Sequence, residues 1–183
     1  MLNNRDVFMN EIAKTINFRL ITIDDAEFIL SLRTNGNLNK HLSQTSSSVA
    51  QQKEWIRNYK EREKKGDEYY FIIFRNDNDE AVGTVRLYDF IEDKKSFCWG
   101  SWILNENKTK YAAMESAFLV YQIAFEKLGF ERAHFDVRRE NIKVIAFHQK
   151  MGAKIVAEND LDIFFEIEKE AVMNARSKLI RFL

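Results

Sequence analysis

The segment ENIKVIAFHQKMGA, residues 140–153, contains two side chains whose types and spacing suit chemistry. Asn141 and His148 are seven residues apart, close to two helical turns, so a helix places them on one face, roughly 10 Å apart along its axis. An imidazole exchanges protons near neutral pH, and a carboxamide both donates and accepts hydrogen bonds. The spacing fits either one wall of a reaction site or the polar edge of a core helix.

Hydrophobic periodicity places this segment near the end of a mixed α/β chain built around a single sheet. The pattern predicts strands at 16–22, 69–74, 81–88, 96–104 and 132–137, and a final hairpin from AKIVAEN and LDIFFEIEK. It predicts helices after Thr22–Asp25, after Ser48 and over 111–130, in addition to the opening segment. We expect one domain over 1–183, with a core at 16–168 and a tail at 169–183. The end of the tail, VMNARSKLIRFL, reads as an amphipathic helix that docks on the domain or on a second subunit, as in a homodimer.

Composition removes several classes of function. The 183 residues carry 28 basic and 28 acidic side chains, so the molecule as a whole attracts neither nucleic acid nor an anionic membrane. One cysteine and three histidines give no metal-ligand spacing, and Cys98 reads as a buried structural thiol. No run approaches the roughly 20 apolar residues of a membrane span, and the N-terminus lacks a signal-peptide core. We expect a cytoplasmic protein without metal, nucleic-acid partner or membrane insertion.

With these elements in order, the chain resembles the GNAT superfamily of acyl-CoA-dependent N-acetyltransferases. The most specific likeness is FDVRRENIKVIAFHQKMGA, similar to the family's strand, Asn, helix and Tyr-x-Lys-x-Gly-Phe ending. Asn141 matches the family's Asn, His148 falls where the family usually has Tyr, and Gly152-Ala153 replaces Gly-Phe. The segments SLRTNGNLNKHL, YYFII, GTVRLYDF and FCWGSWI look most like the branch of ribosomal-protein and amino-sugar-nucleotide acetyltransferases. The implied fold is a mainly antiparallel sheet with splayed strands, flanked by helices.

The resemblance implies acetyl-CoA as co-substrate, with its pantetheine arm between the SWIL and HFDV strands. The arm would pair with backbone groups near Trp102, Ile103 and Leu104, as an added strand pairs with a sheet edge. Its pyrophosphate would lie at the N-terminus of the following helix, where free amides favour an anion. That loop, NENKTKYAA, contains no glycine, in contrast to the family's Gly-rich pattern. The residues expected to bind there are Lys108, Thr109, Lys110, Tyr111 and Ala112, and Asn141 is expected to contact the cofactor or cap its helix.

The same resemblance assigns the catalytic and acceptor residues. His148 replaces the aromatic residue that acts as general acid, a role that imidazole can take. Asp89 is the first candidate for the general base and Glu115 the second, although an acid is favoured in a helix's first turn in any case. The acceptor side is expected to contain Arg33, Asn35, His41, Arg86 and Tyr88. Arginine suits a phosphate, and tyrosine suits stacking on a base or sugar.

Three hypotheses for function follow. The first is an N-acetyltransferase acting on a small amino-sugar nucleotide, in bacterial surface polysaccharide synthesis. The second, on the same fold, is a protein N-terminal acetyltransferase. The third is a non-catalytic domain, which the glycine-free loop permits. The flanking genes and the mass gained by candidate acceptors would distinguish these hypotheses.

Overall fold

The computed structural model describes residues 11–38 and 48–179. Its strands are β1 (Glu11–Ile12), β2 (Ile16–Leu20), β3 (Tyr69–Arg75), β4 (Ala81–Ile91), β5 (Ser96–Leu104), β6 (Arg132–Arg138), β7 (Lys154–Glu158) and β8 (Asp162–Glu168). Its helices are α2 (Ala26–Thr34), α3 (Val49–Lys65), α4 (Ala112–Gln122), α5 (Ile142–Lys150) and α6 (Lys169–Leu179). Three short segments join them, η1 (Ile23–Asp25), η2 (Glu92–Lys94) and the π-helical η3 (Ile123–Lys127).

The strands form one sheet in the order β1-β2-β3-β4-β5-β6-β8-β7. Every neighbouring pair is antiparallel except β5 and β6, which are parallel. This confirms the expected mixed α/β class with a mainly antiparallel sheet. The last strand in sequence, β8, lies between β6 and β7, so β7 forms the outer edge.

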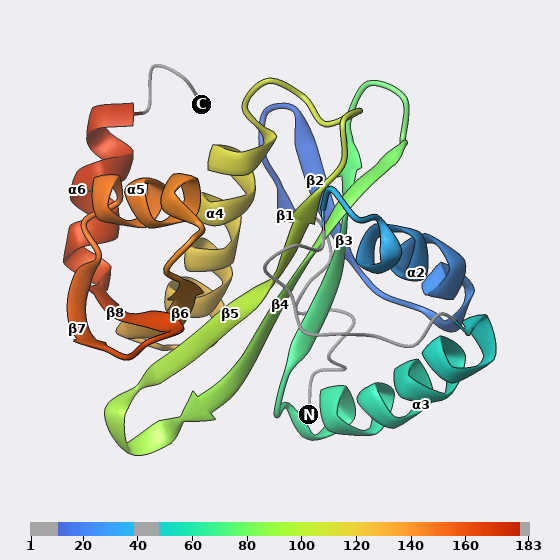
Figure 1. Ribbon diagram of the computed structural model, residues 1–183, viewed down its shortest axis with the longest axis horizontal. Helices are drawn as coiled ribbons and strands as arrows, with labels where there is room; N and C mark the ends of the chain where they lie inside the picture. Colours follow the sequence, from blue (N-terminus) through green and yellow to red (C-terminus); the bar gives the residue numbers. More distant parts are fainter. Residues whose placement is uncertain (1–10, 39–47, 180–183) are drawn as a thin grey trace.

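Helices cover both faces of the sheet, as Figure 1 shows with α2 and α3 on one side and α4, α5 and α6 on the other. The side chains of β3 show why. Phe71 and Ile73 belong to the large core under α4, whereas Tyr70 and Ile72 belong to a smaller core under α2 and α3. A strand that is buried on both faces is apolar at every position, which explains the unbroken run YYFIIF.

The capping residues and the glycine predicted to begin and end the first two helices are confirmed. Thr22 and Asp25 form the predicted capping box, and Ser48 accepts a hydrogen bond from the Gln51 amide. Gly66 ends α3 with a φ of 83°, a conformation that glycine adopts without steric cost. The long predicted helix at 111–130 is shorter than expected. Its regular part ends at Gln122, and η3 continues it towards Gly129.

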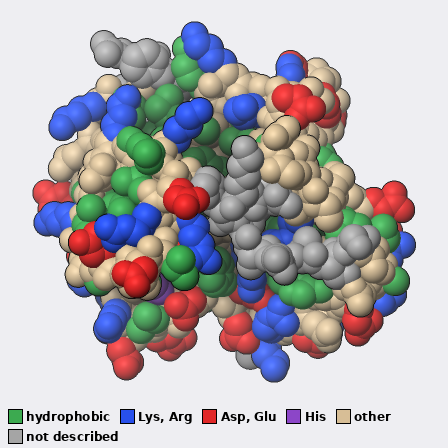
Figure 2. All heavy atoms as spheres, in the orientation of Figure 1, with side chains coloured by type: hydrophobic (Ala, Val, Ile, Leu, Met, Phe, Trp, Pro, Cys, Tyr) green, Lys and Arg blue, Asp and Glu red, His purple; other side chains and the backbone are tan. Residues whose placement is uncertain are grey.

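The predicted tail helix is present as α6, which packs against α4 and buries Val172 and Ala175. The part of the chain that the structure describes contains no helix with the length and apolar character needed to cross a membrane. Acidic and basic side chains are interspersed over the lower half of the face in Figure 2, consistent with the balanced composition.

The parallel pair β5–β6 is short. Its two pairs of facing residues are Ser96 with Arg132 and Phe97 with Ala133. Beyond them β5 follows β4, whereas β6 follows β8 over seven residue pairs. The two strands therefore diverge after their first residues, as the splayed-strand expectation required.

Close approach of β4 and β5 requires a glycine in β4. A Cβ atom at Gly83 would lie 2.2 Å from the backbone oxygen of Ile103. We expect Gly83→Ala to lower the free energy of unfolding by about 2 kcal/mol or more, because neither backbone can yield without breaking the ladder. Gly36→Ala is the matched control, since its added methyl would meet no heavy atom within 4 Å. Denaturant titration of both variants measures the difference, and equal stabilities would contradict the steric account.

Candidate active site

Divergence of β5 from β6 leaves one edge of β5 without a strand partner beyond Phe97. A β-bulge in β5 shapes this edge, because Thr84 faces Ile103 while Arg86 faces Gly100. Ser101 in the bulge has a φ of 46°, and its carbonyl accepts a 2.9 Å hydrogen bond from the Thr84 hydroxyl. The unpaired edge offers backbone groups to an extended molecule, which fits the pantetheine arm that the resemblance implies.

A cavity of about 350 Å³ lies at the divergence. It is lined by β5, β6, α5, the end of α2 and Tyr88 of β4. Five residues named from the sequence line it: Arg33, Tyr88, Trp102, Asn141 and His148. Others that line it were not anticipated, among them Trp99, Ser101, Phe135, Asp136 and Arg138.

His148 is the most enclosed polar group of this cavity, at 4% exposed. Its ring lies 4.2 Å from that of Phe135 and 5.3 Å from that of Trp99, measured between centroids. Its Nδ1 is buried and has no hydrogen-bond partner among the described residues. Burial lowers the pKa of His148 from 6.5 to about 4, because the aromatic surroundings disfavour the charged form. The imidazole is therefore neutral at pH 7.

Asn141 lies where the sequence placed it relative to His148. It stands immediately before α5, its backbone carbonyl accepts the amides of Val144 and Ile145, and its side chain makes no capping hydrogen bond. The Asn141 side chain lines the cavity together with His148. Of the two predicted roles, a side-chain cap is absent, and contact with a bound molecule stays a prediction.

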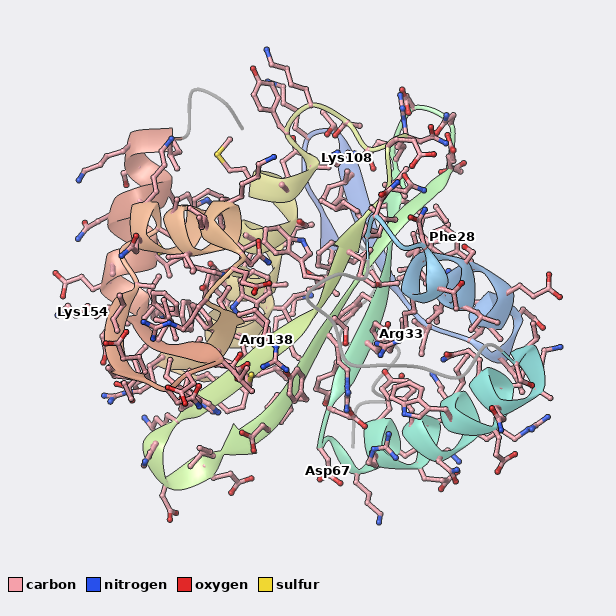
Figure 3. The ribbon with its side chains drawn as sticks, in the orientation of Figure 1. Phe28, Arg33, Asp67, Lys108, Arg138 and Lys154 are labelled. Carbon is pink, nitrogen blue, oxygen red and sulfur yellow. The ribbon has the colours of Figure 1, made fainter. Side chains whose placement is uncertain are left out.

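Three charged side chains line the same cavity as His148. Arg33 comes from the last turn of α2, and Asp136 and Arg138 come from β6. In Figure 3 the two arginines both lie near the middle of the molecule, with Arg33 to the right of Arg138, on the side of α2. Arg138 also donates a 3.1 Å hydrogen bond to Asp162. Alternation along HFDVR marks Asp136 and Arg138 as residues of one sheet face, and this was the available sequence signal for them.

Asp89, the first candidate for the general base, is not among the residues that line this cavity. The register of β4 against β5 shifts after Tyr88, and Asp89 has a φ of 52°. Its carboxylate instead meets His134, with 3.0 Å between Oδ2 and Nε2. His134 in turn lies 2.7 Å from the Ser96 hydroxyl, so these three side chains link β4, β5 and β6 where β5 and β6 still pair. The sequence analysis did not anticipate the β-bulge after Tyr88, which turns Asp89 away from the cavity of His148.

Glu115, the second candidate, is also outside this cavity. It is 1% exposed on α4, and its Oε2 accepts hydrogen bonds from the Thr15 amide at 3.1 Å and the Thr15 hydroxyl at 2.7 Å. The Thr15 hydroxyl lies 2.6 Å from that of Thr109. Glu115 thus anchors β2 and the loop before α4, which accounts for an acid at that position without catalysis.

The glycine-free loop leads into α4, which begins at Ala112 as the pyrophosphate expectation requires. The Lys108 amide donates to the Asn105 carbonyl and the Ala112 amide to that of Thr109. The Lys110 amine lies 5.1 Å from the centre of the Tyr111 ring. Trp102 is anchored to α4 by a 3.0 Å hydrogen bond from its indole nitrogen to Ser116. Ile103 and Leu104 pair with β4 on their other edge.

The remaining acceptor-side residues are dispersed. Arg86 forms an ion pair with buried Glu68, and its guanidinium lies over the rings of Trp55, at 5.3 Å, and Tyr88, at 4.7 Å. Arg86 therefore supports Tyr88 in the cavity wall and does not itself line the cavity. Asn35 follows α2, where its side chain accepts the Asn37 amide, and His41 lies outside the described residues.

Cys98 is buried in β5, as expected for a structural thiol. Burial raises its pKa to about 12, so the thiol stays protonated at neutral pH and is a poor nucleophile. The described residues contain no group of three or more His, Cys, Asp or Glu side chains that could hold a metal ion.

Comparison with known proteins identifies the family of this chain. Residues 15–154 match the family model described as an acetyltransferase (GNAT) domain. The apo structure of FdhC, described as a nucleotide-linked sugar GNAT, is 53% identical with a TM-score of 0.88, over 96% of this chain and 98% of that one.

Two further matches are more distant. The Bacillus subtilis protein named "Probable N-acetyltransferase YjcK" is 29% identical over 145 residues, which cover 76% of this chain and 80% of that protein. Spermidine N-acetyltransferase from Vibrio cholerae, solved with CoA and spermine, shares the fold at 18% identity, with a TM-score of 0.75 over 87% of this chain and 98% of that one. The chain belongs to the acetyltransferase (GNAT) family and is an acetyl-CoA-dependent acetyltransferase.

Proposed function

We propose that the acceptor of this acetyltransferase is the amine of a small amino-sugar nucleotide, as used in bacterial surface polysaccharide synthesis. The observation that carries this proposal is the pair Arg33 and Arg138, which line one cavity with His148 from separate elements. Two guanidinium groups beside a reaction site suit a diphosphate, since each can donate two parallel hydrogen bonds to phosphate oxygens. The likeness to a nucleotide-linked sugar GNAT at 53% identity supports the same class of acceptor.

Acetyl-CoA supplies an activated thioester, and the chain's part is to hold it and to stabilise the charge that develops on transfer. The unpaired edge of β5 near Trp102, Ile103 and Leu104 would hold the pantetheine arm. The N-terminus of α4 would face the pyrophosphate. The Ala112 amide already donates to the Thr109 carbonyl, so the amides of Ala113 and Met114 would hold the anion. Thr109, Lys108 and Lys110 precede that turn, and Asn141 faces the cavity from the start of α5.

The neutral state of His148 changes the role proposed for it. With a pKa of about 4, only about one molecule in a thousand carries an imidazolium at pH 7. The neutral ring carries one proton, on either Nδ1 or Nε2. A proton on Nδ1 would form a buried N–H without an acceptor, so the favoured tautomer carries its proton on Nε2. That N–H can donate a hydrogen bond to the departing sulfur and so stabilise the thiolate.

Asp136 is the carboxylate proposed to assist the amine. It lines the cavity from β6, whereas Asp89 and Glu115 do not. An amine attacks only when deprotonated, and it must lose a further proton once the new C–N bond forms. Asp136 is exposed to solvent, so a proton taken from the nitrogen can pass onward to water.

The acceptor class is tested by offering the protein acetyl-CoA with three kinds of amine. These are a panel of amino-sugar nucleotides, the same amino sugars without the nucleotide, and peptides with a free N-terminus. We expect mass gain with an amino-sugar nucleotide, and a KM about 10- to 100-fold higher for Arg138→Met, because a charged hydrogen bond to phosphate is lost. Arg139→Met is the matched control, since Arg139 bonds to Glu158 and lies outside the cavity. Acetylation of the peptides alone would reject the proposal.

The proposed catalytic role of His148 is tested by measuring kcat. The variant His148→Phe keeps an aromatic ring among the neighbouring rings of Phe135 and Trp99 and removes the N–H donor. We expect kcat to fall by about 100-fold with little change in the affinity for acetyl-CoA, which calorimetry measures separately. His134→Gln serves as the control, because that histidine is not among the residues lining the cavity. Parallel losses of kcat and acetyl-CoA affinity in His148→Phe would indicate a structural role.

Burial of His148 also predicts how stability depends on pH. The unfolded chain takes up a proton near pH 6.5 and the folded chain only near pH 4, so the unfolded state binds more protons between these values. The contribution of His148 to stability is complete above pH 6.5 and is lost as the pH falls towards 4. We expect the wild-type protein to lose about 2–3 kcal/mol more than His148→Phe over this window in denaturant titrations. Identical pH profiles would contradict the lowered pKa.

A further inference from the structure

A second cavity, of about 310 Å³, lies between α4, α6 and the chain between β1 and β2. It is lined by Ile12, Ala13, Lys14, Glu115, Phe118, Leu119, Gln122 and Arg176. None of these residues lines the cavity of His148. Figure 1 shows α6 running beside α4, and the two helices are in contact. The volume falls at the lower end of the range for small-molecule sites.

Glu115 gives this cavity a buried anionic group with one oxygen unused. Its Oε2 is fixed by the amide and hydroxyl of Thr15, while its Oε1 is buried and has no hydrogen-bond partner among the described residues. A carboxylate oxygen that is enclosed without a donor costs free energy, more than a neutral group does. Because Thr15 fixes the carboxylate and Glu115 lines the cavity, a cation brought into the cavity would lie beside an anionic group held in place.

Two cations line the same cavity. Lys14 is exposed and Arg176 is half-buried, and within the described residues neither forms an ion pair. Phe118 and Leu119, both buried, supply apolar surface beside them. The cavity therefore combines a site for an N–H donor, a site for an anion and an apolar wall.

We propose that this cavity binds a small apolar zwitterion, of which an α-amino acid with an apolar side chain is the simplest form. Its ammonium group would lie beside the Glu115 carboxylate. Its carboxylate would meet Arg176 and Lys14, and its side chain would lie on Phe118 and Leu119. A ligand with only one of the two charges leaves one of these protein groups unmatched, which gives the site its selectivity.

The test uses calorimetry and thermal shift on the whole protein with L-phenylalanine and L-leucine as probes. Two analogues each lack one charge: phenethylamine lacks the carboxylate and 3-phenylpropionate lacks the ammonium. We expect saturable binding and a raised Tm with at least one amino acid, and about 10-fold weaker binding of both analogues. The absence of binding by both amino acids would overturn the proposal, as would an analogue that binds as tightly as L-phenylalanine.

Variants assign the binding to this cavity. Glu115→Gln keeps the size of the side chain and removes its charge, and Arg176→Met removes the anion-binding group from the surface of α6. We expect each to weaken binding of the amino acid about 10-fold. Lys178→Met is the matched control on the same helix, because Lys178 does not line the cavity. Should Glu115→Gln fail to fold, Arg176→Met still decides, since unchanged binding in that variant would place the ligand elsewhere.

Discussion

The brevity of the β5–β6 pairing is the constraint on which the rest of the site depends. Two residue pairs hold these strands in parallel, and then each follows a different antiparallel neighbour. The bulge at Ser101 is held by the buried Thr84 hydroxyl, so the divergence is built into the sheet and does not depend on a ligand. Backbone groups on the free edge of β5 are thereby available to a bound molecule at a fixed position. Preorganisation of this kind lowers the ordering cost of binding.

The divergence also separates apolar from charged surroundings. Side chains that point towards α5, such as Phe135 and Trp99, enclose His148 and hold its imidazole neutral. Alternate residues of β6, Asp136 and Arg138, lie on the opposite face of the sheet and remain in contact with solvent. The period of two along one strand thus gives a single cavity a dry end, which we propose for the sulfur, and a charged end, which we propose for the acceptor.

Sequence reasoning predicted what local patterns determine. The helical spacing of Asn141 and His148 placed both side chains on one cavity. The order of strands and helices followed from periodicity, except for the two-residue strand β1, which was not predicted. Sequence reasoning failed where the position of a residue depends on how its strand pairs with another strand. Asp89 was misplaced because the bulge in β4 arises from its register with β5, which no spacing within GTVRLYD encodes. The alternation in HFDVR sets Asp136 on one face of its strand, but whether that face lines a cavity depends on which strands diverge.

The glycines of this chain show why the loop before α4, which we propose holds the pyrophosphate, can lack glycine. A glycine is needed where a backbone or ring approaches too closely for a Cβ atom, and here such approaches occur in the sheet. A Cβ at Gly83 would meet a backbone oxygen, and one at Gly100 would lie 3.0 Å from the Tyr88 hydroxyl. The loop before α4 is fixed differently, through the hydroxyl of Thr109, Thr15 and the carboxylate of Glu115. Helix amides can face an anion without glycine when no positive φ is required, and the positive-φ residues of the described chain lie outside this loop.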